Sequence, residues 1–61
     1  MPYVNIRVAG KLSRKQKKKI SRGVTKVITR VAKKPKDSII IFIDEEKREN
    51  IAKGGILLDE N

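Results

Sequence analysis

A chain of 61 residues that contains neither cysteine nor histidine has few ways to stabilise a fold. A first-pass estimate of about 1.5 kcal/mol of ordering entropy per residue sets roughly 90 kcal/mol against folding, so a core this small rarely suffices. Small proteins usually add disulfides or a structural zinc ion, and both require residues that this chain lacks. Association with further copies remains, so we expect a homo-oligomer.

The length and composition also bound the class of protein. Residues 1–61 are long enough for a single domain, and the chain shows no internal repeat. No apolar stretch reaches the roughly 18 residues that a membrane span needs, and the N-terminus lacks the core of a signal peptide. We therefore expect a cytoplasmic protein with no membrane partner.

Two apolar segments predict β-strands. In residues 3–9 apolar side chains alternate with polar ones, as a half-covered strand requires. Residues 38–44 are almost continuously apolar and β-branched, which is typical of a strand covered on both faces. A polar loop at 45–50 and a glycine pair at 54–55 then predict a turn and a short terminal hairpin.

A helix is predicted between the two strands. Ser13 and Gln16 fit a capping box at its start, and Pro35 ends it near Lys33. The apolar positions form one stripe that we expect to face the sheet: Ile20, Val24, Val27, Ile28 and Val31. Gly23 lies inside this pattern and is expected to permit close packing against the sheet.

Strand, helix and strand in this order make an α/β fold, a βαβ unit with parallel strands. One helix can cover only one face of such a sheet. The apolar run at residues 39–43 therefore has no second layer within the chain. We expect another subunit to cover it.

The net charge of +9 is segregated along the chain. Residues 1–36 carry 13 lysines and arginines and no acid, whereas residues 37–61 carry three and all seven acids. Like charges four residues apart on the helix cost about 0.2 to 0.5 kcal/mol per pair. There are six such pairs: Arg14 with Lys18, Lys15 with Lys19, Lys18 with Arg22, Arg22 with Lys26, Lys26 with Arg30, and Arg30 with Lys34.

Acids from the C-terminal half are expected to offset this repulsion in part. A bound polyanion could also offset the repulsion between the helix cations. Non-specific nucleic-acid binding through the basic helix therefore remains an alternative function. Nucleic acid is not the expected partner, because Tyr3 and Phe42 are the only aromatic residues and both lie on predicted strands. The acids near residues 44–49 lack a fixed ligand spacing, so we expect no metal.

Pro2 is the best candidate for a proton-transferring group. If Met1 is removed, the chain begins with a secondary amine at the end of a rigid strand. The ordinary pKa of an α-amine lies closer to neutrality than that of lysine, and no histidine or cysteine competes for the role. A retained Met1 would turn this nitrogen into an amide, and Pro2 would then be only the rigid first residue of an edge strand.

Taken together, these features resemble the 4-oxalocrotonate tautomerase family. The similarity covers essentially the whole chain and rests on these residues in register: Pro2, the alternating strand, Ser13 with Gln16 and Lys17, Pro35, Ser38, Asp44 with Glu45, and Gly54 with Gly55. The resemblance implies a βαβ subunit with a C-terminal hairpin, a homohexamer, and an isomerase that needs no cofactor. It implies enol–keto interconversion of a small 2-hydroxy-dienoate or 2-oxo acid, with Pro2 as the catalytic base.

The resemblance also assigns a substrate-binding set. The two arginine positions of the family fall on Leu12 and Ile40, and its aromatic position falls on Ile51. Lys11, next to the first of these, is the candidate cation, although a lysine does not reproduce the bidentate grip of an arginine on a carboxylate. We therefore expect a weak tautomerase with a small acid as substrate. A family member without catalysis, acting as an oligomeric binding protein, remains the alternative.

Overall fold

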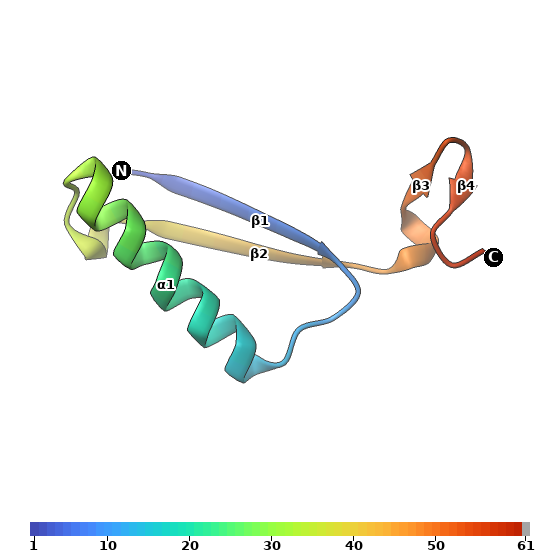
Figure 1. Cartoon of the computed structure of the whole chain (residues 1–61), viewed down its shortest axis with the longest axis horizontal. Coiled ribbons are helices and arrows are strands. Elements are labelled where there is room, and N and C mark those ends of the chain that lie inside the picture. The colour runs from blue at the N-terminus through green and yellow to red at the C-terminus, as the bar shows by residue number, and fades with distance from the viewer. Residues whose placement is uncertain (61) are drawn as a thin grey trace.

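The computed structural model describes residues 1–60, which form a βαβ unit followed by a small hairpin (Figure 1). Strands β1 and β2 pair in parallel and confirm the predicted βαβ unit, and β3 and β4 form the antiparallel hairpin. The elements are β1 (Tyr3–Ala9), α1 (Arg14–Ala32), β2 (Ile40–Glu46), β3 (Ala52–Lys53) and β4 (Ile56–Leu57). Among the described residues, no helix combines the length and the apolar character that crossing a membrane requires.

Strand β2 begins two residues later than the predicted range 38–44. Ser38 ends a short 3₁₀ turn instead, and its N–H and hydroxyl donate to the carbonyl oxygen of Pro35 at 3.0 and 2.8 Å. The N–H of Ile40 donates to the carbonyl oxygen of Pro2 at 3.0 Å, which fixes the start of the parallel pairing. The hydrogen bonding of β1, rather than the apolar pattern of β2, therefore sets this boundary.

The other end of β2 is also displaced, because Glu45 and Glu46 belong to the strand and not to the predicted loop. The parallel register pairs Val8 with Glu45 and Ala9 with Glu46. Beyond it, the N–H of Gly10 donates to the carbonyl oxygen of Glu46 at 2.7 Å. Pairing along the whole length of β1 outweighs the polarity of these two residues.

The predicted helix is confirmed at both ends. The hydroxyl oxygen of Ser13 accepts from the N–H of Gln16 at 3.1 Å, and the Gln16 side chain accepts from the N–H of Ser13 at 2.9 Å. This is the predicted capping box, which satisfies two free donors of the first turn. At the other end, Lys33 takes the left-handed conformation (φ 55°) that commonly ends helices, two residues before Pro35.

The prediction for the apolar face of α1 is correct only in part. The half-buried residues include three of the five predicted ones, namely Ile20, Val24 and Ile28. Val27 and Val31 are 49% and 71% exposed, because the helix turns a mixed face toward the sheet that also includes Ser21, Thr25 and Thr29. Gly23 is exposed, and a Cβ added to it would have nothing within 4 Å, so it does not pack against the sheet as expected.

One face of the β1–β2 sheet is open. The alternation of β1 places Val4, Ile6 and Val8 on the half-buried side. On the opposite side Tyr3 is 69%, Phe42 49% and Ile40 37% exposed. None of the described residues is fully buried, so the predicted absence of a second layer within the chain is confirmed.

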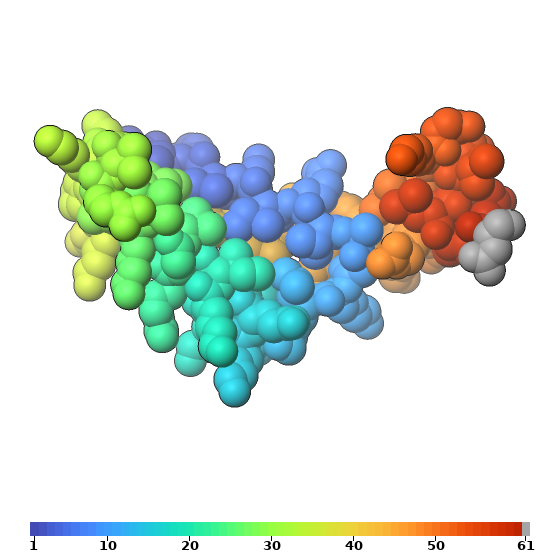
Figure 2. Space-filling view, in the orientation of Figure 1, coloured from blue at the N-terminus to red at the C-terminus, as the bar shows by residue number. Residues whose placement is uncertain are grey.

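The subunit is extended for its size. Figures 1 and 2 show the hairpin beyond the ends of β1 and β2 and away from α1. The radius of gyration is 14.7 Å, against about 10.5 Å for a compact chain of this length. Its accessible surface is 5274 Å², against about 4,000 Å² for a compact protein of this mass. Such a surface supports the prediction that further subunits complete the fold.

Candidate active site

Pro2 lies directly before β1 and is held against the start of β2. Its carbonyl oxygen accepts the N–H of Ile40 at 3.0 Å, and Tyr3 pairs with Ile40 in the parallel register. Pro2 is half-buried, whereas the preceding Met1 is 73% exposed. With Met1 attached, the Pro2 nitrogen is an amide, and loss of Met1 would leave a secondary amine at this fixed position.

An apolar patch adjoins Pro2 on the open face of the sheet. Tyr3 and Phe42 meet edge to face there, with ring centroids 6.2 Å apart and an interplanar angle of 85°. Ile40 lies on the same face, since residues 40 and 42 of a strand point the same way. The residues next to Pro2 in the sheet, Tyr3 along the chain and Ile40 on the paired strand, are therefore aromatic and aliphatic.

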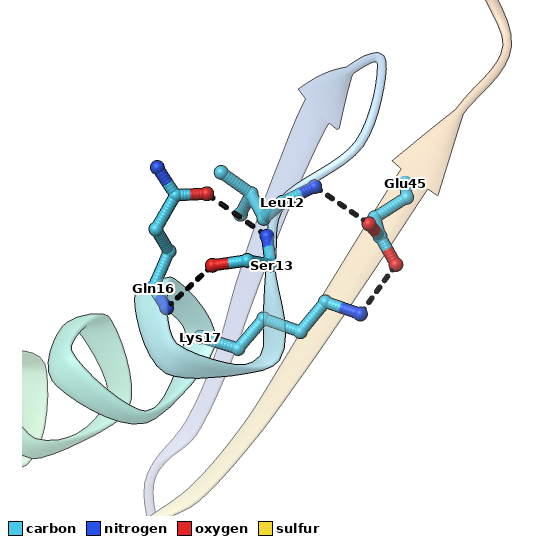
Figure 3. Close-up of polar contacts among 5 residues, drawn as sticks. All are labelled: Leu12, Ser13, Gln16, Lys17 and Glu45. Atoms are coloured by element: carbon cyan, nitrogen blue, oxygen red, sulfur yellow. Dashed lines mark hydrogen bonds and ion pairs between the residues drawn. The ribbon is translucent and has the colours of Figure 1, made fainter.

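Lys11 and Leu12 lie at the opposite end of β1, in the loop that leads to α1. Figure 3 shows this loop joined to β2 by Glu45. The backbone N–H of Leu12 donates to Oε2 of Glu45 at 2.7 Å, and Nζ of Lys17 lies 2.6 Å from Oε1 of the same carboxylate. Leu12 is half-buried and Lys11 is exposed. One carboxylate thus fixes the candidate binding loop and the first turn of the helix together.

The pKa of Glu45 is lowered by these contacts. The hydrogen bond from Lys17 has the largest effect and the N–H of Leu12 the next largest, with a smaller contribution from the charge of Lys11. Partial burial acts in the opposite direction. Glu45 is therefore ionised at neutral pH and works as an acceptor, not as a proton donor.

Ile51 lies beyond β2, at the start of the hairpin segment. Its N–H donates to the carbonyl oxygen of Arg48 at 3.2 Å, and its carbonyl oxygen accepts from the N–H of Leu58 at 2.8 Å. These bonds fix the base of the hairpin. The Ile51 side chain is half-buried.

The candidate residues therefore fall into two groups. Pro2 and Ile40 lie at one end of the sheet, whereas Lys11 and Leu12 lie at the other and Ile51 lies beyond it. Strand β1 has seven residues, so at about 3.3 Å per residue it separates the two ends by roughly 20 Å. A single chain does not bring the whole predicted set together.

One further charged contact joins β1 and β2. Nη2 of Arg7 lies 3.7 Å from Oδ2 of Asp44, and both side chains are well exposed. Exposed pairs of this kind contribute little to stability. Residues 1–60 contain no group of three or more acidic, histidine or cysteine side chains placed to hold a metal ion.

Glu45 contributes to the family resemblance in the sequence, but the sequence did not predict its contacts with Leu12 and Lys17. The parallel register places it opposite Val8, close to where the chain leaves β1. A basic helix start beside an acid at this register position is the signal that could have identified it. The expected pairing between the helix and the C-terminal acids is realised here through Lys17.

The sequence matches proteins of known family over nearly its full length. The family model described as tautomerase enzyme matches residues 2–61. A probable tautomerase of Streptococcus agalactiae is 42% identical over 45 residues, which cover 74% of this chain and 75% of that protein. The fold of the chain also matches solved structures of tautomerase homologues.

The crystal structure of DmpI from Helicobacter pylori superposes with a TM-score of 0.83 and 30% identity, over 93% of this chain and 90% of that one. A heterohexamer 4-oxalocrotonate tautomerase from Chloroflexus aurantiacus has the same fold, with a TM-score of 0.87 at 22% identity and coverage of 98% and 97%. The resemblance seen in the sequence is thereby confirmed. The chain belongs to the tautomerase enzyme family.

Proposed function

We propose that the protein is an isomerase that interconverts the enol and keto forms of a small 2-hydroxy-dienoate or 2-oxo acid. The Pro2 amine is its general base once Met1 is removed. The observation that carries the proposal is the position of Pro2, half-buried and tied to Ile40 at the start of the sheet in a chain of the tautomerase family. No cofactor takes part in this chemistry.

The reaction needs one group that both accepts and returns a proton. The neutral amine takes the proton of the substrate's enol hydroxyl, and the resulting ammonium delivers a proton to a carbon of the conjugated system, which leaves the keto acid. An amine in apolar surroundings favours its neutral form, so its pKa should lie below the usual 7.7 to 8.0 or so of an α-amine. Ile40 and the adjoining apolar patch support this environment.

The proposed active form is a homo-oligomer, specifically a hexamer. Two observations support assembly: the open sheet face, and the roughly 20 Å that separates Pro2 from Leu12 within one chain. A second subunit that supplies Lys11, Leu12 and Ile51 beside Pro2 would complete the binding set. The fold relative from Chloroflexus aurantiacus is a heterohexamer. The lack of cysteine fits the cytoplasm, the compartment that we propose.

The proposed substrate carries one carboxylate. Leu12 and Ile40 stand where the family has arginines, and Ile51 stands at its aromatic position, so these three side chains would form an aliphatic wall. Lys11 would supply the single cation near the acid. A dicarboxylate would find no second partner and should have no large advantage.

The test compares three forms of the protein in the ketonisation of a 2-hydroxy-dienoate and an arylenolpyruvate. These are the processed protein, the Pro2→Ala variant and a form that retains Met1, with intact mass used to verify the N-terminus of each. A general base typically contributes about 10² to 10⁴-fold. The Met1 form should therefore lose at least about 100-fold in kcat/KM, and Pro2→Ala, which keeps a primary amine, should lose less.

Equal turnover by all three forms, or none above the buffer-catalysed rate, would contradict the proposal. The second outcome would favour the alternative of a non-catalytic, oligomeric binding protein of the same family. If the protein isolated from its native host still carries Met1, the proposal also fails, because the Pro2 nitrogen is then an amide and not a base.

A further inference from the structure

The cations of α1, together with Lys36 in the 3₁₀ turn after the helix, line an open groove of about 880 Å³. Five of them recur every fourth residue, namely Arg14, Lys18, Arg22, Lys26 and Arg30, and Lys17 and Lys36 complete the set. Between them the groove is lined by Ser21, Thr25 and Thr29, which are half-buried. We refer to these ten residues as the cationic groove.

Acids of the same subunit barely reach the cationic groove. Within residues 1–60, the ion pairs are Arg7 with Asp44 and Lys17 with Glu45, so Lys17 is the only groove cation that is paired. Most of the other acids follow the end of β2 or lie in the hairpin segment, which Figure 1 shows away from α1. The expectation that C-terminal acids offset the charge of the helix is therefore met at one position only.

Further copies of the chain cannot neutralise this charge. Each copy has 16 basic and seven acidic residues. Even if every acid of an oligomer paired with a base, nine cations per subunit would remain. A partner that balances them must have a different composition and a high density of negative charge.

We propose that the cationic groove binds the phosphate backbone of duplex DNA without reading its sequence. Residues 14 to 30 of a helix span about 24 Å, and duplex DNA carries one negative charge per roughly 1.7 Å of its axis. A row of cations along that length can contact several phosphates and release their counterions. This binding is independent of the Pro2 chemistry, because it uses the helix and not the sheet.

The residues between the cations leave the contact with the partner to the cations themselves. Ser21 already donates its hydroxyl to the carbonyl oxygen of Lys17 at 2.8 Å, and Oγ1 of Thr29 is buried, so neither hydroxyl is free to donate to a phosphate. No aromatic side chain lines the groove, so bases of a single strand have no surface on which to stack. These features favour backbone contacts to a duplex over capture of a single strand.

The experiment is a fluorescence-anisotropy titration of the assembled protein with a mixed-sequence DNA duplex, repeated over a series of salt concentrations. At about 150 mM salt we expect a Kd in the micromolar range or below, with a log Kobs against log salt slope of about −4 to −6. This slope corresponds to the six groove cations that are not paired with Glu45. The corresponding single strand should bind at least about 10-fold more weakly, because it lacks stacking partners.

Two matched triple variants locate the binding surface. Lys18→Gln, Arg22→Gln and Lys26→Gln remove three groove cations, whereas Lys15→Gln, Lys19→Gln and Lys34→Gln remove three that do not line the groove. Both triples lower the net charge from +9 to +6, because each removes three positive charges. The first should weaken binding at least about 10-fold and make the slope less negative by about 3, and the second should change affinity less than about 3-fold.

Circular dichroism and sedimentation verify that both triples keep their helix and their assembly. The single variant Arg22→Gln, with an expected slope change of about 1, provides the test if a triple fails to fold. Equal losses in the two triples would overturn the proposal, because only net charge would then matter. A wild-type Kd for the duplex above about 100 µM, the weak end of non-specific binding, would also overturn the proposal. This includes the result that polyglutamate binds and DNA does not.

Discussion

At the scale of single residues, Glu45 connects three parts of the subunit. Its carboxylate accepts the N–H of Leu12 in the β1–α1 loop and pairs with Lys17 on the helix, while its backbone belongs to β2. Leu12 and Lys11 belong to the proposed binding set, so in the proposed enzyme Glu45 would position the loop that carries them without touching the substrate.

The lowered pKa of Glu45 predicts a pH-dependent contribution to stability. In the unfolded chain the pKa returns to about 4.5, so the contribution is fully present above that pH. It is lost as the pH falls through the lower pKa of the folded state. In urea unfolding at fixed protein concentration, Glu45→Gln should be less stable than wild type at about pH 7, and the two should converge at about pH 2.5.

Glu49→Gln is the matched control, because Glu49 forms no ion pair within residues 1–60. It should unfold like the wild type at both pH values. A Glu45→Gln variant as stable as wild type at neutral pH would show that the contact with Lys17 contributes nothing in solution.

Leu12 predicts the substrate preference of the proposed enzyme. Leu12→Arg would place a cation at the position that the resemblance matches to the family's first arginine, and one charge-assisted contact is worth about 1.5 to 3 kcal/mol. Relative to wild type, this variant should raise the ratio of kcat/KM for a dicarboxylate over a monoacid by roughly 10- to 150-fold. Leu12→Met is the control and should leave the ratio unchanged. A wild type that already prefers the dicarboxylate strongly would contradict the proposed role of the aliphatic wall.

Among the helices and strands, the sequence predicted correctly the features that depend on interactions between residues close together in the chain. The capping box, the end of the helix before Pro35 and the alternation of β1 all depend on neighbours in sequence. The limits of β2 depend instead on its parallel pairing with β1, which apolar composition does not encode. The exposure of Val27 and Val31 depends on the rotation of the helix over the sheet, which a stripe of apolar residues fixes only approximately.

Gly23 gives a test of the helix environment. It lies in the interior of α1 with an ordinary helical conformation, and nothing in the subunit lies within 4 Å of an added Cβ. Gly23→Ala should therefore stabilise the protein by about 0.5 to 1 kcal/mol in chemical unfolding. A loss of stability would instead indicate that another subunit packs closely against this glycine.

At the scale of the whole molecule, the sequence predicted the family and the fold but not how the candidate site is divided. Pro2 is predicted from the chain itself and Leu12 from the resemblance, and the register shows why one chain keeps them apart: they flank a seven-residue strand. The sequence of one chain does not show which subunit of an oligomer contributes each residue of a shared site. The proposed site is therefore a property of the assembly.

The open face of the sheet predicts the assembly itself. We expect wild-type protein to sediment as an oligomer at micromolar concentration. Burial of a large apolar side chain contributes about 1.5 to 3 kcal/mol, so Phe42→Lys should raise the concentration at which the oligomer dissociates at least about 10-fold. Val31→Lys, which alters an exposed valine on the helix, should have a smaller effect. A folded wild-type monomer at these concentrations would contradict the proposed assembly.

The proposed reaction depends on the free amine of Pro2, which transfers the proton. The most direct measurement combines the pH dependence of kcat/KM for the processed protein with an NMR titration of nitrogen-15-labelled Pro2. We expect kcat/KM to rise with pH as the amine loses its proton, and both curves to report the same pKa, below the usual α-amine value of about 7.7 to 8.0. A kcat/KM that is independent of pH while the Pro2 nitrogen titrates would show that another group, or none, carries the reaction.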